Sequence, residues 1–213
     1  MDPGSDGRRS TSLGIRTETT PSRWILWNCF ATQGDPYRES DLTFTYTRSL
    51  GDFTLGCAYA FYYGYAPENF YSHELSAVAA YELELGPLTL IPSLGYFFNI
   101  GPDSAEGRGS AKAASSFLLL RLDGHLPVFG DIVAIEPWGA LGVNFQYNTE
   151  SGPEGEPVPF DGANNLECGI SLPINISSSL TFSGYVAYSH AFAPLTETAS
   201  ETFWGGVSLL LTF

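Results

Sequence analysis

The residues with the clearest capacity for chemistry are five charged side chains in three segments. In two of these segments a pair of charges is separated by one residue. Glu82 and Glu84 flank one leucine, Arg121 and Asp123 flank another, and Glu136 lies in a third segment. Alternate positions of a β-strand share a face, so strands at these segments would bring all five side chains to the inner side of a sheet. Two interpretations stay open. Arg121 offsets Glu136 in an ion-pair plug, or the unbalanced carboxylates form a constriction that prefers cations.

The histidines, which most often carry acid–base catalysis, do not assemble a catalytic unit. His73, His125 and His190 are the three in the chain, and none has a serine and an acid that would face it from neighbouring positions. No His, Cys and Asp cluster has metal-site spacing, and no glycine-rich loop that binds phosphate opens a helix. We therefore expect no catalytic residue, no metal and no cofactor, and a hydrolytic enzyme is the weaker alternative.

The elements that must position these residues are ten segments of alternating polarity, which we expect to be β-strands. The connections after the second, fourth, sixth and eighth segments are short, and those after the odd-numbered ones are generally longer. The longest is the acidic loop 148–162. Short turns on one rim and longer loops on the other are typical of an outer-membrane barrel. The expected strands are 23–31, 41–50, 53–64, 71–85, 88–100, 113–124, 132–147, 163–173, 179–192 and 201–213.

The alternation also predicts which side chains face lipid and which face the lumen. Segment 71–85 would show Leu75, Tyr81, Leu83 and Leu85 to lipid. Segment 132–147 would show Phe145 and Tyr147 to lipid and turn Asn144 and Gln146 inward. Pro92 and Pro137 lie inside expected strands and predict bulges or weak pairing, because proline cannot donate to the ladder.

The end of the chain supports a membrane location. Residues 201–213 alternate apolar side chains and finish on an aromatic ring, so Trp204 and Phe213 are expected to mark a membrane-targeting terminal strand that pairs with the first. No run approaches eighteen apolar residues, which excludes a helical span and leaves a barrel as the membrane-crossing structure.

Composition narrows the partners and the compartment. The net charge of −14 argues against nucleic acid, because phosphate binding needs basic clusters. The three cysteines form no CxxC pair and are expected to be packing residues. Residues 1–22 are expected to lie outside the barrel, which would comprise 23–213. Residues 1–10 lack the apolar core of a signal peptide, so we expect the true beginning to lie upstream.

Several strands also resemble those of one family. The quoted stretches are Thr202-Phe-Trp-Gly-Gly-Val-Ser-Leu-Leu-Leu-Thr-Phe213, Leu166-Glu-Cys-Gly-Ile-Ser-Leu-Pro173 followed by Ser179-Leu-Thr-Phe182, and Glu39-Ser-Asp-Leu-Thr-Phe-Thr-Tyr46 with Gly51-Asp-Phe-Thr-Leu-Gly56. They resemble uncharacterised outer-membrane β-barrel proteins of Gram-negative bacteria over roughly residues 24 to 213. The resemblance is specific for the class and not for an activity. Such relatives usually carry a signal peptide and one or more further strands ahead of the strand that contains the tryptophans, and this chain departs from them there.

These observations together predict an all-β, antiparallel, up-and-down transmembrane β-barrel of about ten strands in the bacterial outer membrane. Its expected partners are the lipid bilayer, the barrel-assembly machinery through the terminal strand, and small solutes. The expected function is non-enzymatic, either passage of small solutes or a plugged structural or surface barrel. Two alternatives stay open: an adhesin or receptor that acts through loop 148–162, and a soluble lipocalin-like binding barrel.

Overall fold

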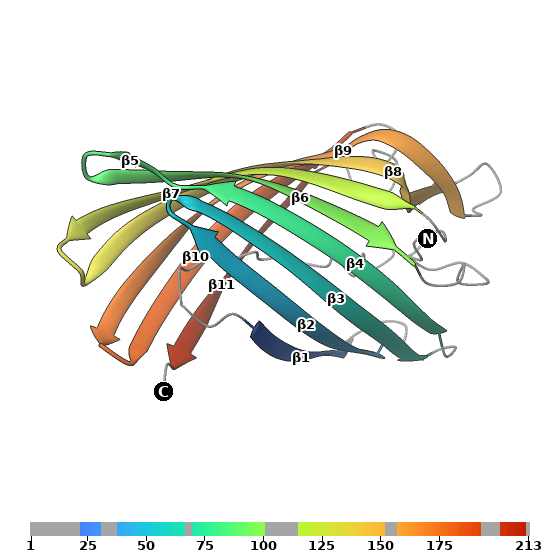
Figure 1. Ribbon diagram of the computed structural model, residues 1–213, viewed down its shortest axis with the longest axis horizontal. Helices are drawn as coiled ribbons and strands as arrows, with labels where there is room; N and C mark the ends of the chain where they lie inside the picture. Colours follow the sequence, from blue (N-terminus) through green and yellow to red (C-terminus); the bar gives the residue numbers. More distant parts are fainter. Residues whose placement is uncertain are drawn as a thin grey trace.

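The computed structural model describes residues 22–30, 38–66, 70–100, 115–151, 157–192 and 201–211, which form one antiparallel, up-and-down sheet. Neighbours in the chain are neighbours in the sheet from β1 to β11, and β5 continues the line of β4 beside β6 (Figure 1). The ten predicted strands are confirmed. The strands are β1 (Ser22–Phe30), β2 (Arg38–Leu50), β3 (Phe53–Ala66), β4 (Phe70–Tyr81), β5 (Leu83–Leu85), β6 (Leu88–Asn99), β7 (Ser116–Phe129), β8 (Val133–Ser151), β9 (Pro157–Ser177), β10 (Leu180–Ala191) and β11 (Glu201–Leu211).

The described residues contain no helix. None of the described segments therefore forms a helix long and apolar enough to cross a membrane.

The connections alternate in length as predicted. At one end of the sheet the strands are joined by 51–52, 86–87, 130–132 and 178–179, and at the other end by generally longer segments. We call these the turn end and the loop end. Gly51 and Gly86 have φ angles of 64° and 67°, a left-handed conformation that glycine adopts without steric cost, as tight hairpin turns require.

The long loop 148–162 is mostly strand, which corrects the prediction made for it. Strand β8 continues to Ser151 and β9 begins at Pro157, so only 152–156 lie between them and outside the described residues. Thr149 pairs with Pro159 and Ser151 with Pro157. The polar, proline-rich composition suggested a loop, but the pairing of the two strands extends the hairpin beyond it.

Both internal prolines interrupt the ladder, as predicted. The β4–β6 pairing stops at Ala80 opposite Ser93, next to Pro92, and resumes as β5 at Leu83. The β7–β8 pairing has a gap between Asp123 and Leu126, opposite Pro137. Each gap lies where a proline nitrogen has no hydrogen to donate.

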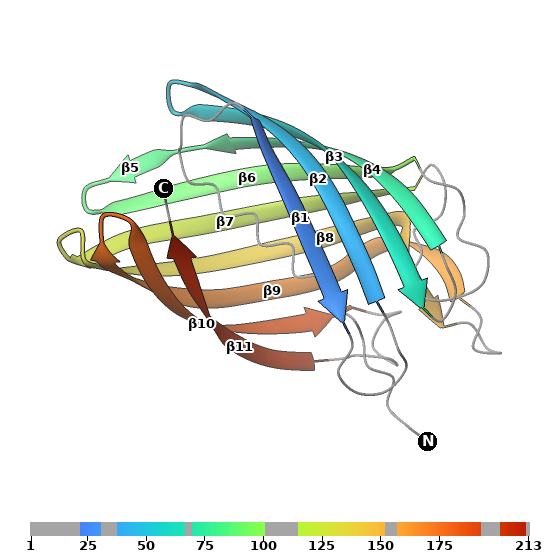
Figure 2. The same ribbon diagram turned by 90° about the horizontal axis from the view of Figure 1, so that it is seen from below.

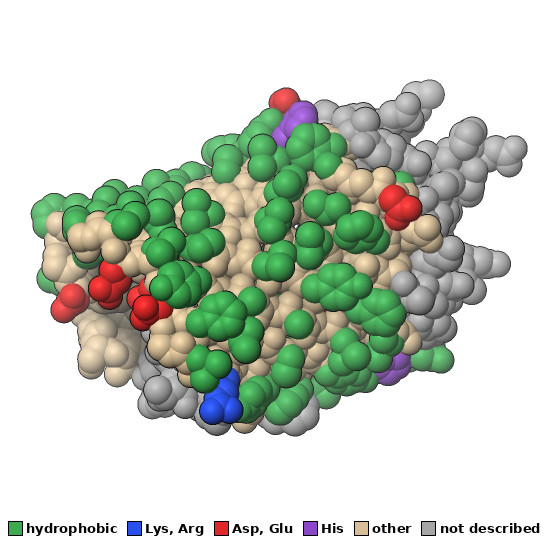
Figure 3. All heavy atoms as spheres, turned by 45° about the horizontal axis from the view of Figure 1, so that its top comes forward, with side chains coloured by type: hydrophobic (Ala, Val, Ile, Leu, Met, Phe, Trp, Pro, Cys, Tyr) green, Lys and Arg blue, Asp and Glu red, His purple; other side chains and the backbone are tan. Residues whose placement is uncertain are grey.

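The two faces of the sheet differ as the alternation predicted. Leu75, Tyr81, Leu83 and Leu85 are exposed on the outer face. Hydrophobic side chains are spread over the face of the sheet seen in Figure 3, and the few charged ones lie near its margins. The inner face buries small side chains, among them Ala60, Ala80, Ala140 and Ala187.

Two predicted faces at the loop end of β8 are wrong, those of Gln146, which shares the outer row of Ser116, and of Tyr147. Ser116 pairs with Gln146 whereas Phe117 pairs with Asn144, so β8 carries a bulge at this point. Gln146 has a φ of 58°, unusual for a residue other than glycine. A bulge adds one residue to a strand and reverses the alternation beyond it, and Tyr147 therefore turns inward.

The sheet curls strongly, but its edges do not join. No pairing links β1 to β11 in the described part of the chain, and both views show the two edge strands facing each other across a gap (Figures 1 and 2). The predicted pairing of the last strand with the first is therefore not formed in this structure. Phe213 and residues 1–21 lie outside the described residues.

Candidate functional site

Two polar clusters lie on the inner face, one at each end of the sheet. The turn-end cluster comprises Arg121, Asp123, Trp138, His125 and Glu136. The loop-end cluster is centred on Glu74. The β6 partners of Arg121 and Glu74 are Ser93 and Asn99, six residues or about 20 Å apart at about 3.3 Å per residue, so the two clusters are separate sites.

The guanidinium of Arg121 contacts two side chains in the turn-end cluster, Asp123 and Trp138. Its Nε donates to both oxygens of Asp123 at 2.9 and 2.8 Å, and its Nη2 lies 2.6 Å from Asp123 Oδ1. Its Cζ stands 4.5 Å from the ring centroid of Trp138, a cation–π distance. The indole in turn covers Gly169, where an added Cβ would lie 2.7 Å from its atoms. Arg121 is therefore paired along its own strand and stacked on the next.

The predicted Arg121–Glu136 pair is wrong. Arg121 is opposite Ala140 in the β7–β8 register, four residues from Glu136 and about 13 Å along the strand. Glu136 instead lies 3.1 Å from His125, its nearest neighbour across the hairpin, measured from Oε1 to Nδ1. The sequence placed the residues on the correct face, but it could not supply the register that chooses partners.

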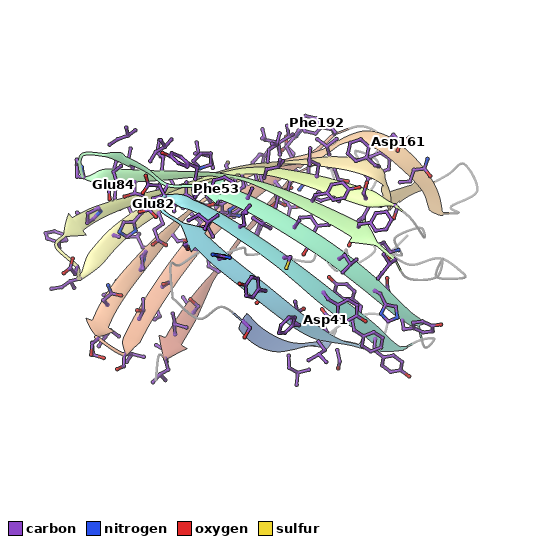
Figure 4. All side chains as sticks on the ribbon, in the orientation of Figure 1. Asp41, Phe53, Glu82, Glu84, Asp161 and Phe192 are labelled. Carbon is purple, nitrogen blue, oxygen red and sulfur yellow. The ribbon has the colours of Figure 1, made fainter. Side chains whose placement is uncertain are left out.

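Glu82 and Glu84 share the turn end without joining this network. Glu84 pairs with Thr89, which pairs in turn with His125, so these residues lie on one row of the inner face. Figure 4 shows both glutamates near the β5 hairpin, far from Asp161 and Phe192 at the loop end. No described side chain forms an ion pair with either glutamate within 4.0 Å.

Trp204, expected to mark the terminal strand, belongs to the inner face. Its partner is Ala187, which lies opposite Gly169 and so continues the row that contains Trp138. The alternation makes Phe203 and Val207 the outward residues of β11, and they are 74% and 73% exposed. Phe213 lies beyond the described residues, so its position is not assigned.

The loop-end cluster contains a carboxylate that is almost fully buried. Glu74 on β4 is 7% exposed. The hydroxyl of Tyr62 on β3 donates to its Oε1 at 3.1 Å, and the hydroxyl of Tyr147 on β8 donates to its Oε2. Such hydrogen bonds to an ionised oxygen are stronger than neutral ones, so the carboxylate ties three strands together.

Amides and aromatic rings surround this carboxylate. Asn99, 1% exposed, accepts a hydrogen bond from the Ser72 hydroxyl at 2.8 Å. Asn144, 0% exposed, donates to the carbonyl of Phe160 at 2.6 Å. The ring of Phe117 lies 6.0 Å from that of Tyr147 and 6.3 Å from that of Phe97. The cluster is thus densely packed.

The inner face is strongly acidic. Among side chains that the structure describes, Arg121 is the one basic group on that face, since Arg48 shares the outer side with its partner Leu55. The inward carboxylates, placed by the pairing register, are Asp41, Glu74, Glu82, Glu84, Asp123, Glu136 and Glu167.

Two of the histidines lie on the outer face, apart from these clusters. His73 Nδ1 is 2.6 Å from the Tyr59 hydroxyl and its ring packs among Phe61 and Tyr71. His190 lies 4.0 Å from Glu201. No group of three or more His, Cys, Asp or Glu side chains in the described ranges is arranged to hold a metal ion.

The loop-end cluster was not predicted as a site from the sequence. Its one signal in the sequence is Glu74, an acid at an inward position of a segment whose other inward side chains are mostly small or polar. Tyr147 gave no signal because the bulge at Gln146 reverses its face.

Comparison with known proteins adds no family. No protein-family model matches the chain, and no curated protein sequence matches it.

Proposed function

We propose that the protein is a β-barrel of the bacterial outer membrane whose lumen allows small solutes to pass, with a preference for cations. One observation carries the membrane assignment: the apolar outer face of the curled sheet, opposed to an inner face of small and acidic side chains. In lipid a sheet must present apolar side chains outward and satisfy its polar groups internally. A soluble barrel would need a polar exterior. The resemblance to uncharacterised outer-membrane barrels is consistent with this assignment.

Closure of the barrel is part of the proposal, and the strand register supports it. One row of Cα partners runs from Glu201 around the sheet to Arg48. Arg48 lies two residues toward the turn end from Tyr46, the partner of Ser22. If Ser22 paired with Leu211, the two ends of this row would be offset along the strands by about 12 residues, or about 40 Å. The circumference of a ring of ten strands is about 48 Å. The resulting tilt of about 40° is normal for a barrel.

This closure can be tested by cross-linking. The proposed closure would place Leu26 opposite Val207, two residues of the outer face that are 70% and 73% exposed. We expect a Leu26→Cys, Val207→Cys pair, in a chain with Cys29, Cys57 and Cys168 replaced by alanine, to form a disulfide within one molecule. The pairs Leu26→Cys with Gly205→Cys or Leu209→Cys are the register controls. Cross-links only between molecules would overturn closure by β1 and β11.

Cation preference follows from the inner charges. Arg121 is bound to Asp123 and is outnumbered by inward carboxylates, which lower the energy of a cation in the lumen. The turn-end pairs lie along the wall rather than across it, since each joins residues of one strand or of neighbouring strands.

The experiment is a planar-bilayer recording on refolded protein in a KCl gradient. We expect a reversal potential of the sign for cation preference, and a further shift in the same direction in Arg121→Ala, because Asp123 then loses its counter-charge. Arg48→Ala removes an exposed charge from the outer face and should leave the reversal potential unchanged. Anion preference, or an absence of current in all three folded forms, would overturn solute passage and favour a plugged barrel.

A further inference from the structure

Tyr147 and Glu74 join two strands that are not neighbours. Strands β6 and β7 lie between β4 and β8 in the sheet order, so the two backbones are about 14 Å apart along the sheet, from three strand spacings of about 4.8 Å. The hydroxyl of Tyr147 nevertheless reaches the carboxylate of Glu74. The contact therefore crosses the concave side of the sheet, unlike every contact made by Arg121.

The backbone of β8 is shaped to make this contact. Gln146 adopts a φ of 58° at the bulge, and this turns the following residue to the inner face. Strained backbone of this kind persists only where its surroundings enforce it, and it is concentrated at functional positions. The Phe117 ring packs against the Tyr147 ring, with 6.0 Å between the ring centroids.

The other end of the contact is equally fixed. Glu74 also accepts a hydrogen bond from Tyr62 at 3.1 Å and is 7% exposed. In an environment with so little water, hydrogen bonds to a carboxylate are strengthened. The contact is thus a rigid tie rather than a passing encounter of two surface groups.

We infer that the Tyr147–Glu74 contact is a strut across the lumen that restricts the loop end and sets the rate at which solutes pass. The acidic turn end would then select the charge of the solute and the strut would limit its flow. This inference rests on the proposed solute passage, so its test includes a measurement that does not need a current.

The first measurement is single-channel conductance of Tyr147→Ala, Tyr147→Phe and Glu74→Gln. Where a constriction limits current, its removal should raise conductance roughly threefold or more in Tyr147→Ala, with smaller increases in the other two variants, which keep the shape of the side chains. Phe145→Ala is the matched control, because Phe145 lies two residues away on the outer face and is 44% exposed.

The second measurement is access of a membrane-impermeant thiol reagent from the loop side. Ser93→Cys serves as the reporter, since Ser93 lies on the inner face opposite Arg121, on the turn side of the strut. The protein is displayed on intact cells with the native cysteines replaced by alanine. We expect slow labelling with the strut intact and faster labelling in Tyr147→Ala, Tyr147→Phe and Glu74→Gln.

The combined outcomes separate the two proposals. Equal labelling rates in all folded variants would overturn the strut, whatever the conductance. Faster labelling with no current in any variant would support the strut and overturn solute passage. A current that appears only after Tyr147 is changed would support the strut and show that it plugs the unchanged protein, which overturns solute passage in that form. Increases in Phe145→Ala as large as in Tyr147→Ala would also overturn the strut, because the effect would then not depend on the inner contact.

Discussion

The turn-end and loop-end clusters occupy the same inner face but are organised differently. At the turn end the side chains of Arg121, Asp123, Glu136 and His125 are 12%, 27%, 35% and 47% exposed, and their contacts follow the wall. At the loop end Glu74 is 7% exposed and is bonded across the concave side of the sheet. The difference shows that inward charges acquire different roles according to which strands they join.

The largest expected effect is a difference in the free energy of unfolding between a loop-end variant and a turn-end variant. Glu74→Ala leaves two part-buried tyrosine hydroxyls without this acceptor, and we expect it to lower the free energy of unfolding by about 3 kcal/mol, from about 1.5 kcal/mol for each hydrogen bond to a charged group. Glu84→Ala, at an exposed position of the same inner face, should remain close to the unchanged protein. Chemical unfolding in lipid vesicles measures both. Equal losses would erase the distinction between the clusters.

A second prediction compares how tightly the two ends are packed. An added Cβ at Gly142 would lie 2.5 Å from Phe117 Cζ and 2.6 Å from Asn165 Oδ1, whereas one at Gly169 would meet the Trp138 indole. We expect Gly142→Ala to lower the free energy of unfolding by about 2 kcal/mol and Gly169→Ala to lower it by about 1 kcal/mol, since overpacking is relieved more easily at the less buried turn end. The same unfolding assay applies. Gly184→Ala, with no atom within 4 Å, is the control, and a larger loss at Gly169 would reverse the ranking.

The smallest expected effect tests the pairing within the turn end. Asp123→Asn weakens the two-pronged contact with Arg121 and should cost about 1 kcal/mol, within the range for charged hydrogen bonds at partly exposed sites. Glu136→Gln should cost less, because its partner His125 is 47% exposed on its side chain. If Glu136→Gln were the more damaging change, the Arg121–Glu136 pair expected from the sequence would be the better description.

Much of the fold could be predicted because its signals are local. The ten strands, the alternation of short and long connections, the apolar outer stripe of Leu75 and Tyr81, and the breaks at Pro92 and Pro137 all depend on a period of two or on a missing donor. Each of these properties belongs to a residue and its immediate neighbours.

The sequence by itself determined which residues form strands, which face most of them show, and that the inner side is acidic. Tertiary structure alone decided that Arg121 pairs with Asp123 rather than Glu136, that Tyr147 turns inward to Glu74, and that β8 and β9 extend into the expected loop from both sides. The physical reason is that partners across a sheet depend on register and bulges. A shift of one residue between strands changes every contact without changing the local pattern.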